Sequence, residues 1–250
     1  MAGLATAVTG SLNALIGASG ACVRSKAPLE LRGPFPGAAY YLRNVTAGVF
    51  GGDAYEVDVT AAAGSVIRIA SSSATKVHDS AGRESSLRVR LAAEPGATLL
   101  WGPHATIIQT GASYRQSTTV SLAPGSRVVL GEILVLGRLA RGEQFEFTRL
   151  ESNFDVTLEG AAVYSEAYCL TPGADLAASM AGRGVLASVY ILGAEWPALE
   201  ERLICTLKNE PLAGCSALPN DAGVVVRCFC DSLSQGQALV EGVLRLVSDR

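Results

Sequence analysis

Glu132 is a carboxylate in the middle of an apolar stretch, where a charged side chain is not expected. It lies within VVLGEILVL (128–136), an apolar run that predicts a strand. Side chains alternate along a strand, so Glu132 would share one face with four apolar residues: Val128, Leu130, Leu134 and Leu136. Such a strand is expected to be covered on both faces, and a buried ionised carboxylate then needs a cation, several donors or water nearby.

Charged residues follow this strand closely. Arg138 and Arg141 are the nearest candidate cations for the Glu132 carboxylate, and Glu143 adds a second acid to the same stretch. One interpretation is a structural network of ion pairs that holds the strand and the next turn together. The other is a polar site that water keeps hydrated. The residues alone leave both open.

Four cysteines form a second candidate site. Cys228 and Cys230 are two residues apart on a predicted strand, so their thiols share a face and could bind a soft metal together with Cys205 and Cys215. The resulting C-x9-C-x12-C-x-C spacing is not a usual zinc pattern, and free cysteine mostly packs as a small apolar residue. Packing is therefore the favoured interpretation, with a structural metal site as the alternative.

The sequence contains none of the common catalytic motifs. It contains no G-x-S-x-G elbow, no phosphate-binding Walker loop, no H-E-x-x-H and no dinucleotide-binding glycine motif after a strand. His78 and His104 are its only histidines, and no spacing links either of them to a nucleophilic serine. We expect no enzyme activity. Hydrolysis by a serine paired with one of these histidines is the remaining catalytic alternative.

Composition excludes several classes of partner. The 250 residues are 49% hydrophobic and 17% charged, with a formal net charge of -3 and no run of Lys or Arg. A basic patch for nucleic acid or an anionic membrane surface is therefore not expected. No apolar stretch reaches the roughly 18 to 20 residues of a membrane-spanning helix, so we expect a soluble protein.

The amino-terminal segment and the cysteines bear on location. Met1–Cys22 lacks the basic region and dense apolar core of a secretory signal, and its apolar residues recur at helical intervals: Leu4, Val8, Leu12, Leu15 and Ile16. The six cysteines belong to a chain far longer than the small secreted domains that depend on disulfides. Reduced thiols in the cytoplasm are the simpler expectation.

The elements that must position these residues are mostly strands. From 38 to about 170, runs rich in β-branched and aromatic residues alternate with Gly, Pro and Ser-Ala clusters. Three degenerate segments, 61–70, 93–102 and 122–131, each place a glycine before an apolar strand: Gly64, Gly96 and Gly125. This spacing indicates stacked units, each a turn followed by a strand.

The last third has a different pattern. Helical spacing relates Trp196, Leu199, Leu203, Ile204 and Leu207, with Pro197 near the start, and a second helical stripe runs from 239 to 247 after a strand at 224–230. The predicted fold is mainly β, with many short strands in stacked sheets and about two helices near the C-terminus. We expect one domain over 1–250, β-rich over 20–193 and mixed helix and strand over 194–250.

Three motifs carry a resemblance to a known family. GVFGGD (48–53) is a glycine-rich turn in which Gly51 and Gly52 permit close backbone approach and Asp53 opens a strand. IASSSATKVHDS (69–80) contributes hydroxyls and a flexible cation, with Thr75 and Lys76 at its centre. GEILVLGRLARGE (131–143) is the longest and most specific of the three. Together, over about residues 28–147, they resemble the UreD (UreH) family of urease accessory proteins.

The resemblance implies a role in urease maturation. UreD proteins form a non-catalytic scaffold with UreF-like and UreG-like accessory proteins, and this complex delivers nickel to apo-urease, in family models through an internal hydrated tunnel. Carboxylates and hydroxyls bind nickel weakly enough to release it. Under this hypothesis no cofactor is held tightly and Ni²⁺ passes transiently along four acids: Asp53, Glu132, Glu143 and Glu166.

The remaining motif residues are assigned structural roles under the same hypothesis: Gly51, Gly52, Thr75, Lys76, Arg138 and Arg141. In GVFGGD, an ordinary interpretation of Asp53 is that it only caps its turn. Thr75 and Lys76 suit either a wet groove or the protection of an exposed strand edge. A β-rich structural or binding module with no part in metal transfer is the alternative function.

Overall fold

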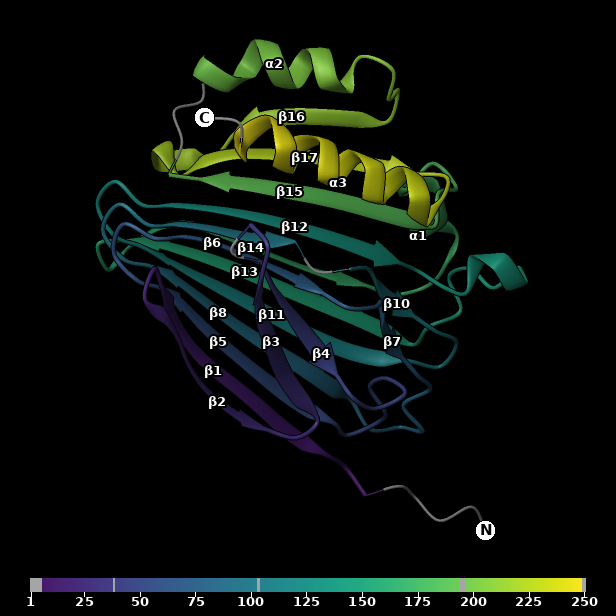
Figure 1. Ribbon diagram of the computed structural model, residues 1–250. Coiled ribbons are helices and arrows are strands. Elements are labelled where there is room, and N and C mark those ends of the chain that lie inside the picture. The colour runs from purple at the N-terminus through teal and green to yellow at the C-terminus, as the bar shows by residue number, and fades with distance from the viewer. Residues whose placement is uncertain (1–5, 38, 103, 194–196, 249–250) are drawn as a thin grey trace.

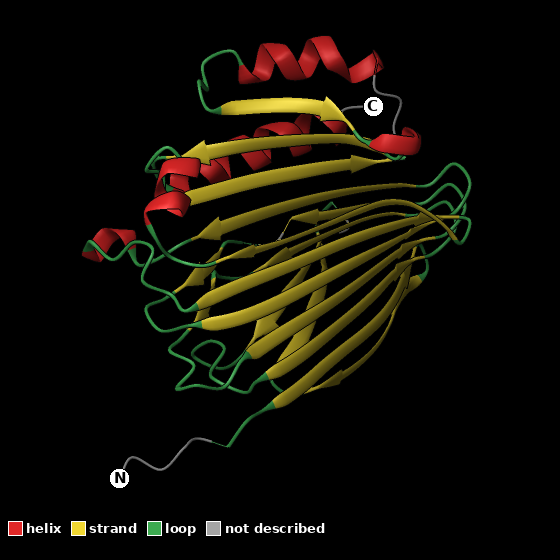
Figure 2. Cartoon of the chain, turned by 180° about the vertical axis from the view of Figure 1, so that it is seen from behind, coloured by secondary structure: helices red, strands yellow, loops and turns green. Residues whose placement is uncertain are grey.

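The computed structural model describes residues 6–37, 39–102, 104–193 and 197–248 (Figure 1). Within these ranges two β-sheets stack on each other, and helices cover the outer face of one of them (Figures 1 and 2). The predicted mainly β fold with stacked sheets is confirmed.

Sheet A has seven strands within the described residues. In spatial order they are β14 (Ala161–Leu170), β13 (Arg149–Leu158), β11 (Ser113–Leu122), β8 (Ser85–Ala93), β5 (Ala54–Ala61), β1 (Thr9–Gly17) and β2 (Gly20–Lys26). The five central strands run parallel, and β14 and β2 pair antiparallel at the two edges. Strand β14 is therefore the edge of sheet A nearest the C-terminal part of the chain.

Sheet B has ten strands in the same ranges. Its main path is β16 (Ala213–Ala217), β17 (Gly223–Cys230), β15 (Val185–Leu192), β12 (Arg127–Val135), β9 (Thr98–Gly102), β6 (Val66–Ser71), β4 (Ala39–Asn44) and β3 (Leu29–Phe35). Two short strands, β10 (Thr106–Ile108) and β7 (Thr75–Val77), continue from one end of β12. From β4 to β13 the chain alternates between the two sheets, as in a coil of stacked turns.

Three glycine turns carry the chain from sheet A to sheet B. Gly64, Gly96 and Gly125 have φ of 68°, 69° and 68°, the left-handed region that glycine adopts most readily. The turns stack on one another, because the amide of Gly64 donates to the carbonyl of Pro95 at 3.0 Å and that of Gly96 to Pro124 at 3.2 Å. The turn-and-strand repeat predicted from the sequence is confirmed.

Strand β12 is buried on both faces, as its unbroken apolar sequence predicts. Val128 and Leu130 belong to the core between the sheets, whereas Val129 and Ile133 pack in a second core under the helices. Glu132 has the same parity as Val128 and Leu130, so it faces the space between the two sheets. The predicted strand thus places this carboxylate inside the molecule.

Helices cover sheet B on the side away from sheet A. α3 (Leu233–Ser248) packs on β15 and β12, and α2 (Pro197–Leu207) packs against α3 and β16 (Figure 1). The two predicted helices are therefore present, with Leu199, Leu203 and Leu207 buried; Trp196 lies outside the described residues. A short α1 (Ala174–Ser179) and two 3-10 turns, Leu139–Arg141 and Pro219–Asp221, were not predicted.

The amino-terminal prediction is wrong. The segment expected to carry a helical stripe forms β1, in which Leu12, Ala14 and Ile16 are buried and the residues between them are exposed. The stripe misled because Leu15, which completes its helical spacing, is 46% exposed on the outer face of the sheet. The β-rich region therefore begins at Thr9 rather than at residue 20. Among the described residues, no helix is both long and apolar enough to cross a membrane.

Candidate functional site

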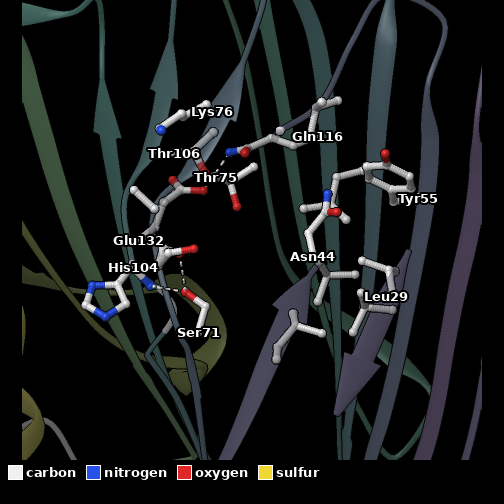
Figure 3. Close-up of a pocket in the computed structure, with 18 of the residues that line it drawn as sticks. Leu29, Asn44, Tyr55, Ser71, Thr75, Lys76, His104, Thr106, Gln116 and Glu132 are labelled. Carbon is white, nitrogen blue, oxygen red and sulfur yellow. Dashed lines mark hydrogen bonds between the residues drawn. The ribbon is translucent and has the colours of Figure 1, made fainter. Parts of the chain in front are cut away.

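A cavity of about 320 Å³ lies between the two sheets (Figure 3). We call it the central cavity. Its walls are largely apolar, with polar groups contributed from both sheets: Ser71, Thr75, Lys76, Thr106, Gln116 and Glu132. Several lining residues are exposed, among them Thr46 and Ser73 on loops and Lys76 on a short strand, so the cavity reaches the surface on this side.

Glu132 enters the central cavity from β12 and meets Gln116 from β11 (Figure 3). The amide nitrogen of Gln116 donates to Oε1 of Glu132 at 2.5 Å and also lies 3.0 Å from the hydroxyl of Ser152. Among the described residues, Gln116 is the only hydrogen-bond donor to Glu132. Burial raises the pKa of Glu132 to about 7, and the hydrogen bond from Gln116 offsets only part of this effect.

The expected partners of Glu132 are elsewhere. Arg138 pairs with Glu143, and Arg141 is exposed on the turn Leu139–Arg141. The chain turns away after β12, at Gly137, which has φ of 134°. Arg138 and Arg141 are therefore close to Glu132 in the sequence but do not pair with it in the structure. The cation that lowers the pKa of Glu132, after burial and Gln116, is Arg227 from β17.

Tyr114 adds an unsatisfied group to the central cavity. Its side chain is completely buried and lines the cavity, yet its hydroxyl has no hydrogen-bond partner among the described residues. Buried hydroxyls are normally hydrogen-bonded, either to protein or to ordered water. The space beside Tyr114 is large enough for several water molecules. The hydroxyl is itself closed to solvent, so its missing partner is a cost to the folded state rather than a contact with water in the cavity.

A second, small cavity of about 10 Å³ adjoins the first. The two share Thr118, Leu130 and Glu132 as walls, and the small cavity continues to Glu166 on β14. Its volume is about that of one water molecule. Glu132 therefore stands where the two spaces meet, with Glu166 on the far side.

Glu166 is held by three side chains from both sheets. Tyr164 and Tyr190 donate their hydroxyls to Oε2 of Glu166 at 2.8 and 3.0 Å, and Arg227 donates to both of its carboxylate oxygens at 2.6 and 2.5 Å. Burial alone would raise the pKa of Glu166, but the hydrogen bonds from Tyr164 and Arg227 outweigh it and hold this pKa below its ordinary value. Glu166 is thus an ionised carboxylate with its charge compensated.

Asp53 lies in a different setting. Its carboxylate accepts hydrogen bonds from the amides of Val8 and Phe50, at 2.8 and 2.9 Å, and from the hydroxyl of Tyr55 at 3.0 Å. It is 3% exposed and lines neither cavity. The capping interpretation of Asp53 fits these contacts, because Phe50 and Tyr55 belong to its own turn and strand, and the Val8 amide ties that turn to the start of the chain.

The glycines before Asp53 meet the backbone of a neighbouring turn. A Cβ on Gly51 would overlap the carbonyl oxygen of Ser80, and Gly52 has φ of 89°. The first position therefore needs glycine for space and the second for its backbone conformation. Both fit the structural role expected of them.

Glu143 also lines neither cavity. It is buried and accepts a hydrogen bond from the amide of Thr110 at 2.8 Å and one from Nε of Arg138 at 2.5 Å. Burial alone would raise the pKa of Glu143, but these bonds from Arg138 and Thr110 outweigh it and lower this pKa. The Arg138–Glu143 pair thus closes the loop after β12, as the ion-pair interpretation of this stretch expects.

Thr75 and Lys76 line the central cavity from β7. Strand β7 pairs with β10, which in turn pairs with β12, so these residues lie at the carboxyl end of the strand that bears Glu132. Lys76 lines the cavity and is exposed, so its side chain reaches the surface beside it. Both interpretations of this segment fit, because these residues line the cavity and β7 pairs along its length only with β10 within the described residues.

The cysteines pack as apolar residues. Cys228 and Cys230 are buried together under the helices, and burial raises the pKa of both thiols. Cys205 is exposed and Cys215 is half-buried. Among the described residues, no group of three or more His, Cys, Asp or Glu side chains is arranged to hold a metal ion.

The ring nitrogens of both histidines contact groups other than a serine hydroxyl, and His104 meets one only through its backbone amide, which donates to Oγ of Ser71 at 2.7 Å (Figure 3). The ring of His78 stacks on Phe50 with centroids 4.4 Å apart, and its Nε2 lies 3.3 Å from the carbonyl of Ala47. Nδ1 of His104 lies 3.2 Å from the side-chain amide of Gln237. The geometry therefore gives no support to a serine–histidine pair.

Comparison with known proteins identifies the family. The profile of a family described as UreD urease accessory protein matches residues 21–250. The chain belongs to this family. It is 32% identical to a urease accessory protein UreD of Haloarcula marismortui over 215 residues, which cover 82% of this chain and 71% of the relative. It is 30% identical to one of Anaeromyxobacter sp. over 237 residues, covering 91% of this chain and 80% of that relative.

A third relative matches a shorter part of the chain. The urease accessory protein UreD 2 of a Synechococcus species is 39% identical over 133 residues, 53% of this chain and 49% of the relative. The family profile, which matches residues 21–250, extends well beyond the motif region of residues 28–147 and includes the helical end of the chain.

Some residues of this UreD-family site were missed from the sequence. Arg227 is a single charge inside VVVRCFC, the same signal that singled out Glu132, and could have been found in the same way. Gln116 shares the inward face of β11 with Tyr114 and Thr118, so the polar run on alternate positions was a weaker signal. No signal in the sequence singled out Tyr190, because tyrosine is an ordinary residue in a buried strand.

Proposed function

We propose that this chain is a non-catalytic accessory protein of urease maturation, and that its two adjoining cavities form a hydrated route for nickel on the way to apo-urease. The observation that carries the proposal is Glu132. It lines both cavities, accepts one direct hydrogen bond within the described residues, and has no arginine or lysine in direct contact there. A carboxylate so placed has oxygen lone pairs left to offer a passing cation.

The chemistry of the lining suits transfer. Glu132, the hydroxyls of Thr75 and Thr106, and water would provide a mixed oxygen environment without thiolate. Nickel prefers nitrogen and sulfur ligands for tight binding, so an oxygen site holds it weakly and releases it readily. An ion entering beside Lys76 would meet Glu132 first and Glu166 next.

The partners follow from the family. We infer assembly with UreF-like and UreG-like accessory proteins and with apo-urease, in the cytoplasm. Nickel is the cargo of this assembly, and the role needs no resident cofactor. The family description, UreD urease accessory protein, supports the urease assignment.

Asp53 and Glu143 were also predicted to border the route. Each already accepts several hydrogen bonds, and neither lines a cavity. Their part in nickel transfer stays a prediction, and the proposal is carried by Glu132 and Glu166. A purely structural function is the second candidate, favoured by the ion pairs at Glu143 and Glu166.

Deletion separates these two functions. In a urease-producing host that lacks this chain, the proposal predicts that urease protein accumulates at its normal level with little nickel, and that the restored chain co-purifies with urease and accessory proteins. Metal content is read by mass spectrometry of purified urease. Urease with its full complement of nickel in the deletion strain would contradict the proposal and leave the structural function.

A further inference from the structure

The Arg227–Glu166 ion pair lies beside the small cavity, whose wall includes Glu166 and Tyr190 but not Arg227. Glu166 lies on β14, the edge strand of sheet A, and Arg227 lies on β17 of sheet B, so the pair bridges the two sheets where sheet A ends. Tyr190, on β15 between β12 and β17, donates to the same carboxylate and accepts a hydrogen bond from Arg227 at 2.8 Å. Glu166, Tyr190 and Arg227 thus form a closed triangle of hydrogen bonds beside the small cavity.

The guanidinium occupies the face of Glu166 that a metal ion would need. Nη2 of Arg227 lies within hydrogen-bond distance of both carboxylate oxygens, at 2.6 and 2.5 Å, and Oε2 also accepts the two tyrosine hydroxyls. A divalent cation coordinates the same oxygens at about 2.0–2.2 Å. The two cations cannot occupy this position together.

The Arg227 side chain can leave Glu166 towards solvent. Its side chain is 40% exposed whereas that of Glu166 is 20% exposed, so the guanidinium lies on the solvent side of the pair. A released guanidinium would be hydrated rather than left in an apolar interior, which keeps its displacement inexpensive compared with a sealed pair. Arg138 is equally exposed at 40%, but its partner Glu143 is only 7% exposed and lies away from both cavities, so the two pairs differ in the carboxylate rather than in the arginine.

We propose that Arg227 is a tethered counter-cation that occupies Glu166 in the resting protein and must be displaced before a metal ion can pass this carboxylate. The inference deepens the proposed function and rests on it. Arg227 does two things: it compensates the charge of Glu166 while no metal is present, and its return drives the metal off again. Glu166 therefore binds the cargo weakly although its carboxylate is ionised.

Nickel binding to the purified full-length protein tests this competition. NiCl₂ is titrated calorimetrically into the wild type, Arg227→Gln, Glu166→Gln and the double variant. A hydrogen bond to a charged group contributes enough that its loss changes an equilibrium roughly tenfold or more, so Arg227→Gln is expected to tighten nickel binding roughly tenfold. The gain is expected to disappear in Arg227→Gln/Glu166→Gln, because the freed carboxylate is its source.

A matched surface pair controls for net charge. Arg90 lies 2.7 Å from Asp58 on the outer face of sheet A, so Arg90→Gln removes the same charge away from both cavities. Affinity unchanged or weakened in Arg227→Gln, or an equal gain in Arg90→Gln, would overturn the proposal. Should Arg227→Gln not fold by circular dichroism, Arg227→Lys decides: its single ammonium keeps the charge but loses the planar donors, and a smaller gain is expected.

Different results would contradict the competition by Arg227 and the nickel route itself. If Arg227 does not compete with nickel, Arg227→Gln leaves nickel affinity unchanged while Glu132→Gln still lowers the nickel content of urease in cells. If the route itself is wrong, Glu132→Gln leaves that nickel content at the wild-type level.

Discussion

Replacing Glu132 by glutamine is expected to stabilise the protein at pH 8. The pKa of Glu132 is raised from 4.5 to about 7, because burial disfavours the charged form. One unit of pKa corresponds to about 1.4 kcal/mol, so at pH 8 the ionised carboxylate costs the folded state at most about 3 kcal/mol, and water in the cavity reduces this cost. Glutamine keeps the shape and the oxygen that accepts from Gln116, and it removes this cost.

The sign of the pH dependence follows from the raised pKa. As pH falls through about 7, folded Glu132 takes up a proton before the unfolded chain does, and the wild type gains stability until about pH 4.5. The advantage of Glu132→Gln should therefore shrink from at most about 3 kcal/mol at pH 8 towards zero near pH 4.5.

Urea unfolding followed by circular dichroism measures both quantities. Glu56→Gln is the control, since Glu56 pairs with Arg88 on the exposed face of sheet A and such pairs contribute about 0–1 kcal/mol. Equal unfolding free energies for wild type and Glu132→Gln at pH 8, or a difference that does not change with pH, would refute the description of Glu132 as a costly interior charge.

Three further predictions concern the scaffold. Arg138→Gln leaves buried Glu143 without its cation, and urea unfolding should show a loss of about 2–4 kcal/mol; a loss below 1 kcal/mol would show that Glu143 is compensated otherwise. Because the pKa of Glu143 is lowered, its stabilisation is present above about pH 4.5 and lost as pH falls through its folded pKa, so Glu143→Gln should flatten acid unfolding in this range. Gly51→Ala drives a methyl group into the Ser80 carbonyl and should cost at least about 2 kcal/mol by thermal or urea unfolding; wild-type stability would mean that this turn adjusts freely.

The parts of the fold that could be predicted are those that local periodicity controls. Strand β12 was readable because its apolar residues occupy both parities, and Gly64, Gly96 and Gly125 marked turns that require positive φ. The position of Glu132 in the interior followed from parity alone. The amino-terminal strand failed because Leu15 is apolar yet exposed, which gave a helical spacing by coincidence.

The contacts of the site could not be predicted, since they depend on which strands become neighbours. Glu132 meets Gln116 because β12 and β11 lie in facing sheets, and Glu166 meets Arg227, 61 residues later, because β14 ends one sheet opposite β17 of the other. Sequence distance favoured Arg138 for Glu132, whereas the turn at Gly137 directs Arg138 to Glu143. Such pairings are set by sheet order, which one sequence does not specify.

The nickel content of urease from cells that carry Glu132→Gln is the most direct test of the proposed route. The variant replaces the wild-type chain in a urease-producing host, with Glu56→Gln in parallel, and nickel per urease subunit is measured after purification. The expected result is urease at its normal level with several-fold less nickel, while Glu132→Gln is as abundant as the wild type and still co-purifies with urease. Fully loaded urease from the Glu132→Gln strain would contradict the account.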